Sequence, residues 1–210
     1  MKIIVWNSQD KCVADYHKLI RGCDVLCLLD CGQWTVPVYA LQIQNGLFHW
    51  KDEHEGLSYD IFYCLEKVAF ICRDGLYSGE SVLYSIHSNI GSLVGIRLQD
   101  DFWLFANHES NRSNACHIGE FYLREISDRF RKAAFVADFK EKSYSWAQET
   151  IGGLYCIAPP KGNPPHTTII LFPFIVPFTN FYLLKGFGGP PNRLLFFTLA
   201  FYVFRNHIFS

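Results

Sequence analysis

The sequence predicts an α+β fold in which β-strands dominate and helices are few. Short runs rich in Val, Ile, Leu, Phe and Tyr recur along the chain, with turn-forming residues between them. Two segments place their apolar residues at helical spacing, and each is followed by a strand-like run. With 210 residues, of which 50% are hydrophobic and 17% aromatic, the chain can form a domain with a sizeable buried core.

The chain opens with a strand, a helix and a second strand. Lys2–Trp6 is a short apolar run that ends at Asn7, and 24–29 is a buried run that ends at Asp30. Between them, segment 8–22 has the apolar spacing of a helix. This order is typical of a βαβ-like unit, although the two strands need not be adjacent.

The middle of the chain continues the strand pattern. Segment 34–50 is expected to be a loop that enters a strand, and 65–67 and 99–101 are expected to be tight turns. The strands expected here are 59–65, 67–73, 81–86, 92–98 and 102–106.

The region from 102 to 140 combines two apolar runs with one helix pattern. The first run ends at His108, the second run (133–137) ends at Asp138, and the helix is expected from about 117 to 132. Strand ends that open into loops are where α/β sheets present catalytic side chains. His108 and Asp138 are therefore the centre of the predicted site.

The composition changes at about residue 164. From there to the last residue only three residues carry a charge, and prolines interrupt the uncharged run 167–184. We therefore divide the chain into a domain at 1–163 and an apolar tail at 164–210. A membrane-spanning helix needs about 20 apolar residues, which disfavours a membrane segment. Closing strands of a sheet, or a tail of separate origin, are the alternatives.

Cysteine usage and the N-terminal pattern are those expected of a chain with free thiols in a reducing compartment. A net charge of -1 provides no general attraction to nucleic acid, so DNA binding would need local basic residues or a metal ion. Cys23, Cys27 and Cys31 recur in an apolar run, and we interpret them as small core residues rather than metal ligands. Met1 leads directly into a strand pattern, so no signal peptide is expected, and the cytoplasm is the expected place of synthesis.

Four polar residues stand at or just after predicted strand ends: Asn7, Asp30, His108 and Asp138. Metal-assisted hydrolysis of a phosphodiester needs a carboxylate for the metal, a group that aligns water and an acid for the leaving oxygen. These residue types supply most of that set. Each also has a structural alternative, since Asp30 could cap a turn, His108 could be a hydrogen-bonded strand-end residue and Asp138 could belong to a loop.

Five motifs in order carry a resemblance to a known family. They are Val5-Trp6-Asn7, Asp24–Gly32, Val94–His108, Ala137–Lys140 and Gly152–Ala158. Together they resemble the endonuclease/exonuclease/phosphatase superfamily with the DNase I-like fold, and most of all its toxin-type members, the catalytic B subunits of cytolethal distending toxin. The resemblance implies a four-layer α/β/β/α sandwich, incomplete or altered at the C-terminus.

The resemblance also implies roles for the site residues. Asn7 and Asp30 would lie at a Mg²⁺ or Mn²⁺ ion, His108 would stabilise the phosphate or protonate the leaving group, and Asp138 would orient the attacking water. Lys140 would contact the substrate. Toxin relatives are secreted DNases that act in the host nucleus with two delivery subunits, and some are described as phosphoinositide phosphatases.

The family pattern is altered at several positions. Asp30 stands where the family has Glu, which shortens the carboxylate's reach by about 1.5 Å, one C–C bond. Lys140 replaces an Asn, and 57–63 lacks the arginine of the toxin relatives. Arg205-Asn206-His207 is the nearest counterpart of the family's C-terminal Ser-Asp-His, so His207 is a catalytic candidate and Asn206 a substrate-binding one. An Asn cannot carry the charge that stabilises an imidazolium.

Two classes of function follow. The first is a metal-dependent phosphodiesterase, most like a DNase, with DNA as its partner. The second is a catalytically impaired member that serves as a binding or interaction protein. A phosphoinositide-type phosphatase, tethered through the tail, is a further alternative.

Overall fold

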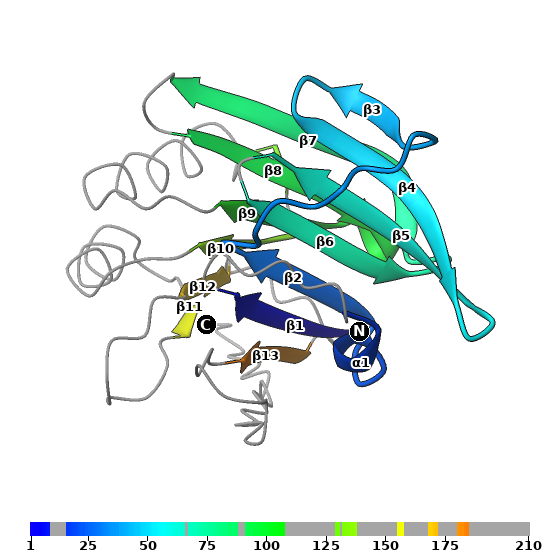
Figure 1. Cartoon of the computed structure of the whole chain (residues 1–210). Helices are drawn as coiled ribbons and strands as arrows, with labels where there is room; N and C mark the ends of the chain where they lie inside the picture. Colours follow the sequence, from blue (N-terminus) through cyan, green and yellow to red (C-terminus); the bar gives the residue numbers. More distant parts are fainter. Residues whose placement is uncertain are drawn as a thin grey trace, which may run out of the picture.

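The computed structural model of the chain describes residues 1–8, 16–65, 67–87, 91–107, 129–130, 132–137, 155–157, 168–171 and 180–184. Within these ranges two β-sheets make up most of the molecule, with one α-helix and one short 3-10 turn (Figure 1). This agrees with the predicted dominance of strands.

The first sheet contains the N-terminal strands. Its described strands have the order β13-β1-β2-β6-β5-β4-β3. β1 is parallel to both of its neighbours, β2 and β13, and the other pairs are antiparallel. The bounds are β1 Lys2–Asn7, β2 Val25–Leu29, β3 Leu41–Gln44, β4 Leu47–His54, β5 Leu57–Cys64, β6 Val68–Arg73 and β13 Asn180–Leu184.

The predicted βαβ opening is confirmed, because β1 and β2 are adjacent and parallel. Between them the described helix α1 is Tyr16–Ile20, which is shorter than the predicted segment 8–22. Ser8 lies beside the end of β2, where its backbone N–H donates to Leu29 O at 2.9 Å, so the helix does not begin there. Residues 9–15 lie outside the described part of the chain.

The second sheet contains the strands that precede His108 and Asp138 in the chain. Its described strands have the order β11-β12-β10-β9-β8-β7. β9 and β10 are parallel neighbours, and the other pairs are antiparallel. A 3-10 turn, η1 Gln99–Asp101, joins β8 to β9 as the predicted tight turn. The bounds are β7 Tyr77–His87, β8 Gly91–Leu98, β9 Phe102–Asn107, β10 Ala133–Ala137, β11 Tyr155–Ile157 and β12 Thr168–Leu171.

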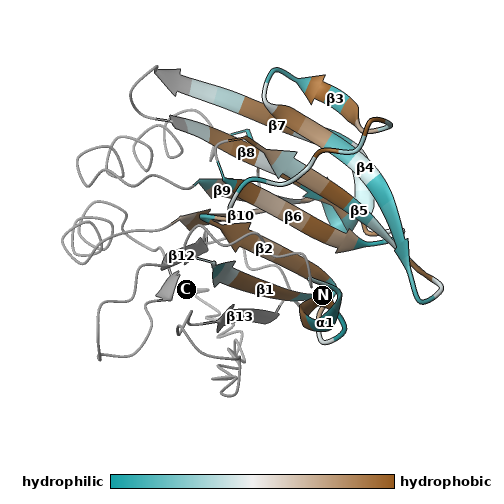
Figure 2. Ribbon diagram, viewed as in Figure 1, coloured by the Kyte–Doolittle hydropathy of each residue, from teal (hydrophilic) through white to brown (hydrophobic). Residues whose placement is uncertain are grey.

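The two sheets pack face to face around one hydrophobic core. Alternate residues of the central strands enter it, for example Val5 and Leu29 from the first sheet and Leu104 and Val136 from the second. Figure 2 shows the hydrophobic character of β2 and β6 and the hydrophilic far end of β4. Burial on both faces explains why the central strands are nearly continuous apolar runs.

A second hydrophobic cluster covers the outer face of the first sheet. Tyr16 and Ile20 of α1 belong to it, together with Leu26 and Leu28 of β2. α1 therefore covers part of this face. The remainder of the predicted outer helical layers is not confirmed, so the four-layer sandwich stays a prediction beyond its two central sheets.

The interpretation of the clustered cysteines as core residues is confirmed. Cys27 is buried between the sheets, and Cys23 and Cys31 are buried in the outer cluster. Burial raises the pKa of the Cys23 thiol to about 12 and that of Cys27 well above its usual value. Burial therefore favours the protonated thiol at Cys23 and Cys27, as is typical of structural cysteines.

Two strands come from the segment that the sequence could not resolve. β13 forms the edge of the first sheet beside β1, and β12 lies between β10 and β11 in the second. No helix in the described part of the chain is long and apolar enough to cross a membrane. The helix predicted for 117–132 lies outside the described residues up to 128, and its predicted end is wrong, because 129, 130 and 132 are not helical.

Candidate active site at the strand ends

The candidate site lies where β1, β2, β9 and β10 end. In Figure 1 the arrowheads of these four strands point to the same end of the molecule. β2 lies against β9 across the core, so the two parallel pairs, one in each sheet, are opposed. The four strands therefore end at the same end of the sandwich.

The first parallel pair presents Asn7 and Asp30. Asn7 is the last residue of β1 and the register partner of Leu29, and Asp30 follows directly. Ile3 and Val5 enter the core, so the alternation of β1 places Asn7 on the same inner face. Asn7 and Asp30 therefore lie at the same end of the first sheet.

The backbone around Asp30 is fixed from the β1 side. The hydroxyl of Ser8, a buried residue, donates to Asp30 O at 3.0 Å. Asp30 itself adopts a left-handed conformation with φ 49°, which is uncommon for a residue with a side chain. Such outliers persist only where surrounding contacts hold them, and they are enriched at functional sites.

The backbone is fixed from the β6 side as well, by Lys67. Cys31 N donates to Lys67 O at 3.1 Å, and Lys67 is also left-handed, with φ 69°. The Lys67 ammonium lies 3.4 Å from Asp30 Oδ1, with side-chain exposures of 41% and 21%. Lys67 is thus a cation of the candidate site.

Sequence reasoning missed Lys67 as a site residue. The sequence places Lys67 correctly in the turn before β6, but it does not indicate that Lys67 lies near Asp30. What brings it to Asp30 is the antiparallel pairing of β2 with β6, in which Leu29 faces Val68. That register depends on contacts between distant segments, and the local pattern does not contain it.

The donor types at this end are ones that Mg²⁺ accepts. Mg²⁺ in proteins takes oxygen ligands, commonly one or two carboxylates, and completes its shell with water and substrate phosphate. Asp30 supplies a carboxylate and Asn7 an amide oxygen. No cluster of three or more His, Cys, Asp or Glu able to hold a metal occurs among the described residues, so these two donors match a sparsely liganded ion only.

The second parallel pair ends at Asn107 and Ala137, which are register partners in β9 and β10. Asn107 is buried, and its side-chain amide donates to Ser92 O at 2.6 Å, which ties the end of β9 to β8. The predicted catalytic residues His108 and Asp138 come next in the chain and lie outside the described residues. Lys140, Asn206 and His207 lie outside them as well, so the structure tests none of these five.

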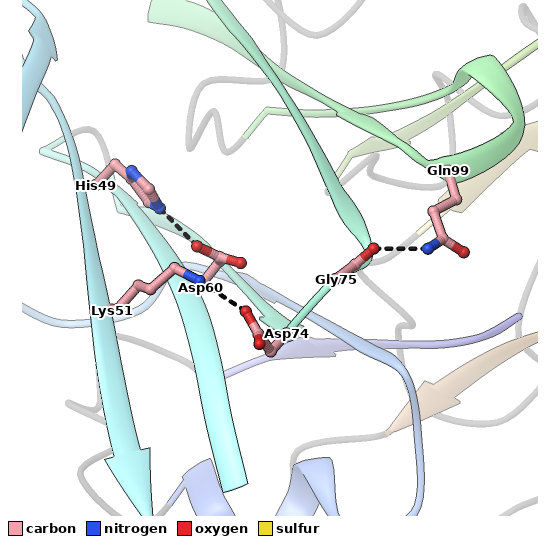
Figure 3. A network of polar contacts seen from close by, with 6 residues as sticks. All are labelled: His49, Lys51, Asp60, Asp74, Gly75 and Gln99. Atoms are coloured by element: carbon pink, nitrogen blue, oxygen red, sulfur yellow. Dashed lines mark hydrogen bonds and ion pairs between the residues drawn. The ribbon is translucent and has the colours of Figure 1, made fainter.

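A separate polar network lies at the other end of the first sheet (Figure 3). Asp74 follows β6, which runs antiparallel to β2, and its carboxylate accepts from Lys51 Nζ at 2.6 Å. This hydrogen bond raises the pKa of Lys51 and lowers that of Asp74. Next to it, His49 Nε2 lies 2.9 Å from Asp60 Oδ1. These two contacts lie at the end of the first sheet opposite Asp30.

The comparisons with known proteins concern the fold. No family model and no curated protein matches the sequence. A humanized D. rerio TDP2 with 14 mutations is similar in structure, with a TM-score of 0.50 and 14% identity over 81% of this chain and 82% of that chain.

Two further structures are similar at lower scores. D. rerio TDP2 complexed with a single-strand DNA product has a TM-score of 0.49 and 13% identity, over 81% of this chain and 82% of that one. A truncated C. elegans TDP2 has a TM-score of 0.41 and 11% identity, over 81% and 83%. None of the three is a toxin subunit. TDP2 has the DNase I-like fold, and this chain shares that fold.

Proposed function

We propose that this chain is a divalent-metal-dependent phosphodiesterase that acts on DNA. The observation that carries the proposal is the meeting of two parallel strand pairs at one end of a DNase I-like sandwich. One pair presents Asn7 and Asp30 there. The residues that follow the other pair in the sequence are His108 and Asp138.

Strand alternation supports the proposed arrangement. Ala106 of β9 and Val136 of β10 point into the core between the sheets. The proposal continues this alternation by one step, which puts His108 and Asp138 on the same inner side as Asn7. An acid, a base and a metal carboxylate would then line one cleft, which is what in-line displacement at phosphorus needs.

The proposed roles follow from the chemistry of each side chain. Asp30 and Asn7 would hold the metal ion, which supplies Lewis-acid polarisation of the phosphoryl oxygen. Asp138 accepts a hydrogen bond from the attacking water and orients it, and His108 donates a proton toward the leaving oxygen. Lys140, Asn206 and His207 are proposed as further contacts to the phosphate and its leaving group.

One observation favours the second candidate function, a catalytically impaired binding protein. The Asp30 carboxylate already lies 3.4 Å from the Lys67 ammonium, and it is shorter than the family's Glu. Both features oppose metal binding. A chain that keeps the fold but binds metal weakly could still recognise nucleic acid.

Nicking of supercoiled plasmid separates these two functions. The full chain is incubated with plasmid and Mg²⁺ or Mn²⁺, next to His108→Ala, Asp138→Ala and Asp30→Asn. We expect nicking by the unaltered chain and a loss of at least about 100-fold in each variant, the scale of a general acid–base or electrostatic contribution. EDTA should abolish the activity.

Equal nicking in all four preparations would point to a contaminant and overturn the proposal. Nicking by none of them, together with retained DNA binding, would select the impaired alternative. A parallel phosphate-release assay on a phosphoinositide tests the lipid alternative, which requires release that the same substitutions abolish. Lys51→Met serves as a control at the far end of the sheet, where activity should be unchanged.

A further inference from the structure

The carboxylate proposed to hold the metal has a cation of the same chain beside it. Lys67 Nζ lies 3.4 Å from Asp30 Oδ1. We propose that Lys67 and the divalent metal compete for Asp30, so that Lys67 sets the metal affinity of the site. The inference rests on the proposed function, because it concerns the same metal position.

Backbone hydrogen bonds fix the positions of Asp30 and Lys67 relative to each other. Asp30 and Lys67 flank neighbouring strands, since Leu29 of β2 pairs with Val68 of β6. The Cys31 N–H donates to Lys67 O at 3.1 Å, and Ser8 Oγ donates to Asp30 O at 3.0 Å. With both backbones held, the two charges separate only by rotation of the side chains, and the lysine stem is the longer and more flexible of the two.

The chemistry of the two side chains makes their partners alternatives. An ammonium has three donors and no lone pair, so it cannot join a metal's ligand shell. Its charge also repels a divalent cation, and that repulsion is strong at a few ångströms. Asp30 has a short side chain, so an ion bound to it stays close to the backbone and to Lys67. Metal binding therefore requires that Lys67 move away or that the ion bind against its charge.

The size of the effect follows from the exposure of the pair. An exposed ion pair contributes a factor of up to about five to an equilibrium, and like-charge repulsion adds to this. We therefore expect removal of the Lys67 charge to tighten metal binding by about three- to tenfold. Lys67→Arg keeps the charge and should stay within about twofold of the unaltered chain.

Calorimetric titration with MnCl₂ alone, without DNA, tests the inference. The full chain is compared with Lys67→Met, which keeps an unbranched stem, and with Lys67→Gln as a second neutral variant. Lys51→Met is the matched control, because it removes one lysine from an ion pair, with Asp74 at 2.6 Å, at the opposite end of the sheet. Thermal unfolding establishes that each variant is folded.

The inference is supported if both neutral variants at position 67 bind Mn²⁺ about three- to tenfold more tightly and Lys51→Met does not. An unchanged or weaker affinity in both overturns it, and so does an equal gain in Lys51→Met. The proposed function fails separately. If Asp30→Asn binds Mn²⁺ as well as the unaltered chain and plasmid is not nicked, Asp30 is no metal ligand and both ideas fall. If nicking and Asp30-dependent binding are present without a Lys67 effect, only the inference falls.

Discussion

Asp60 is an acidic residue that is only 4% exposed. Its contact with a histidine offsets the free energy that burial of its carboxyl group costs. Asp60 Oδ1 lies 2.9 Å from His49 Nε2, and the His49 ring stacks on Phe62 with centroids 4.4 Å apart. A buried carboxylate that loses its partner bears its desolvation alone. The pair therefore stabilises the β4–β5 region only as long as both members are present.

We predict that His49→Leu lowers the free energy of unfolding by about 1–3 kcal/mol, the cost of an unsatisfied buried polar group. Urea denaturation followed by tryptophan fluorescence measures it. The double variant His49→Leu/Asp60→Leu should recover part of the loss, because both polar groups are then gone. Lys51→Met, in the exposed pair beside it, should have a clearly smaller effect. If His49→Leu and Lys51→Met lower the free energy of unfolding equally, burial of the His49–Asp60 pair is not the cause of the loss.

Single residues also show the limit of what the sequence can predict about the site. Asn7 and Asp30 could be placed together because each ends an apolar run in a strand–helix–strand order. Lys67 could not, because its only local signal was a turn, and its closeness to Asp30 depends on the pairing of β2 with β6. The left-handed conformations of Asp30 and Lys67 were equally unpredictable, since non-glycine residues rarely adopt them.

Elements of this fold contact each other closely enough that one glycine is required. Gly95 of β8 is the register partner of Phe105 in β9. A Cβ at Gly95 would lie 2.3 Å from Phe105 Cε1 and 2.5 Å from Cδ1. The Phe105 ring is fully buried and stacks with Trp103 at 5.6 Å, so it has no room to move.

We predict that Gly95→Ala destabilises the protein by about 1–3 kcal/mol, the usual cost of overpacking a core. The midpoint of urea unfolding should fall while its slope stays constant. Gly22→Ala is the matched control, because its Cβ would meet its nearest neighbour, Leu19 O, only at 4.0 Å. A Gly95→Ala protein as stable as Gly22→Ala would mean that the β8–β9 pair is looser than its register indicates.

Elements were predictable where burial produced a clear pattern. β1, β2, β9 and β10 are apolar runs covered by the other sheet, and their positions were confirmed to within one or two residues. The β3–β4 hairpin was harder, because β4 carries Lys51, Asp52 and Glu53 toward its exposed end. Segment 34–50 was expected to be a loop that enters one strand, but two strands lie in its second half, β3 and the first part of β4. Helix ends were least certain, as α1 shows.

The molecule as a whole depends on pairings between its two ends. β13 pairs with β1 in parallel, and Asn180 is the register partner of Lys2. β12 lies inside the second sheet, between β10 and β11. No local pattern could predict these pairings, because the segment from 164 onward has no alternation of apolar and polar residues and only three charged residues. Its strands β12 and β13 are recognised only by their pairing with β1, β10 and β11.

We predict that deletion of 164–210 abolishes cooperative folding. The truncation removes β12 and β13, which leaves β11 without its described partner and turns β1, with its fully buried Ile3 and Val5, into an exposed edge. Thermal unfolding by near-ultraviolet circular dichroism should lose its sharp transition, and the fragment should bind a hydrophobic dye. Deletion of 185–210 keeps every described residue and is the control, which should unfold cooperatively. If the fragment 1–163 melts as sharply as this control, the first 163 residues form a domain that needs neither strand, and the long-range pairings would be additions to a core that is stable alone.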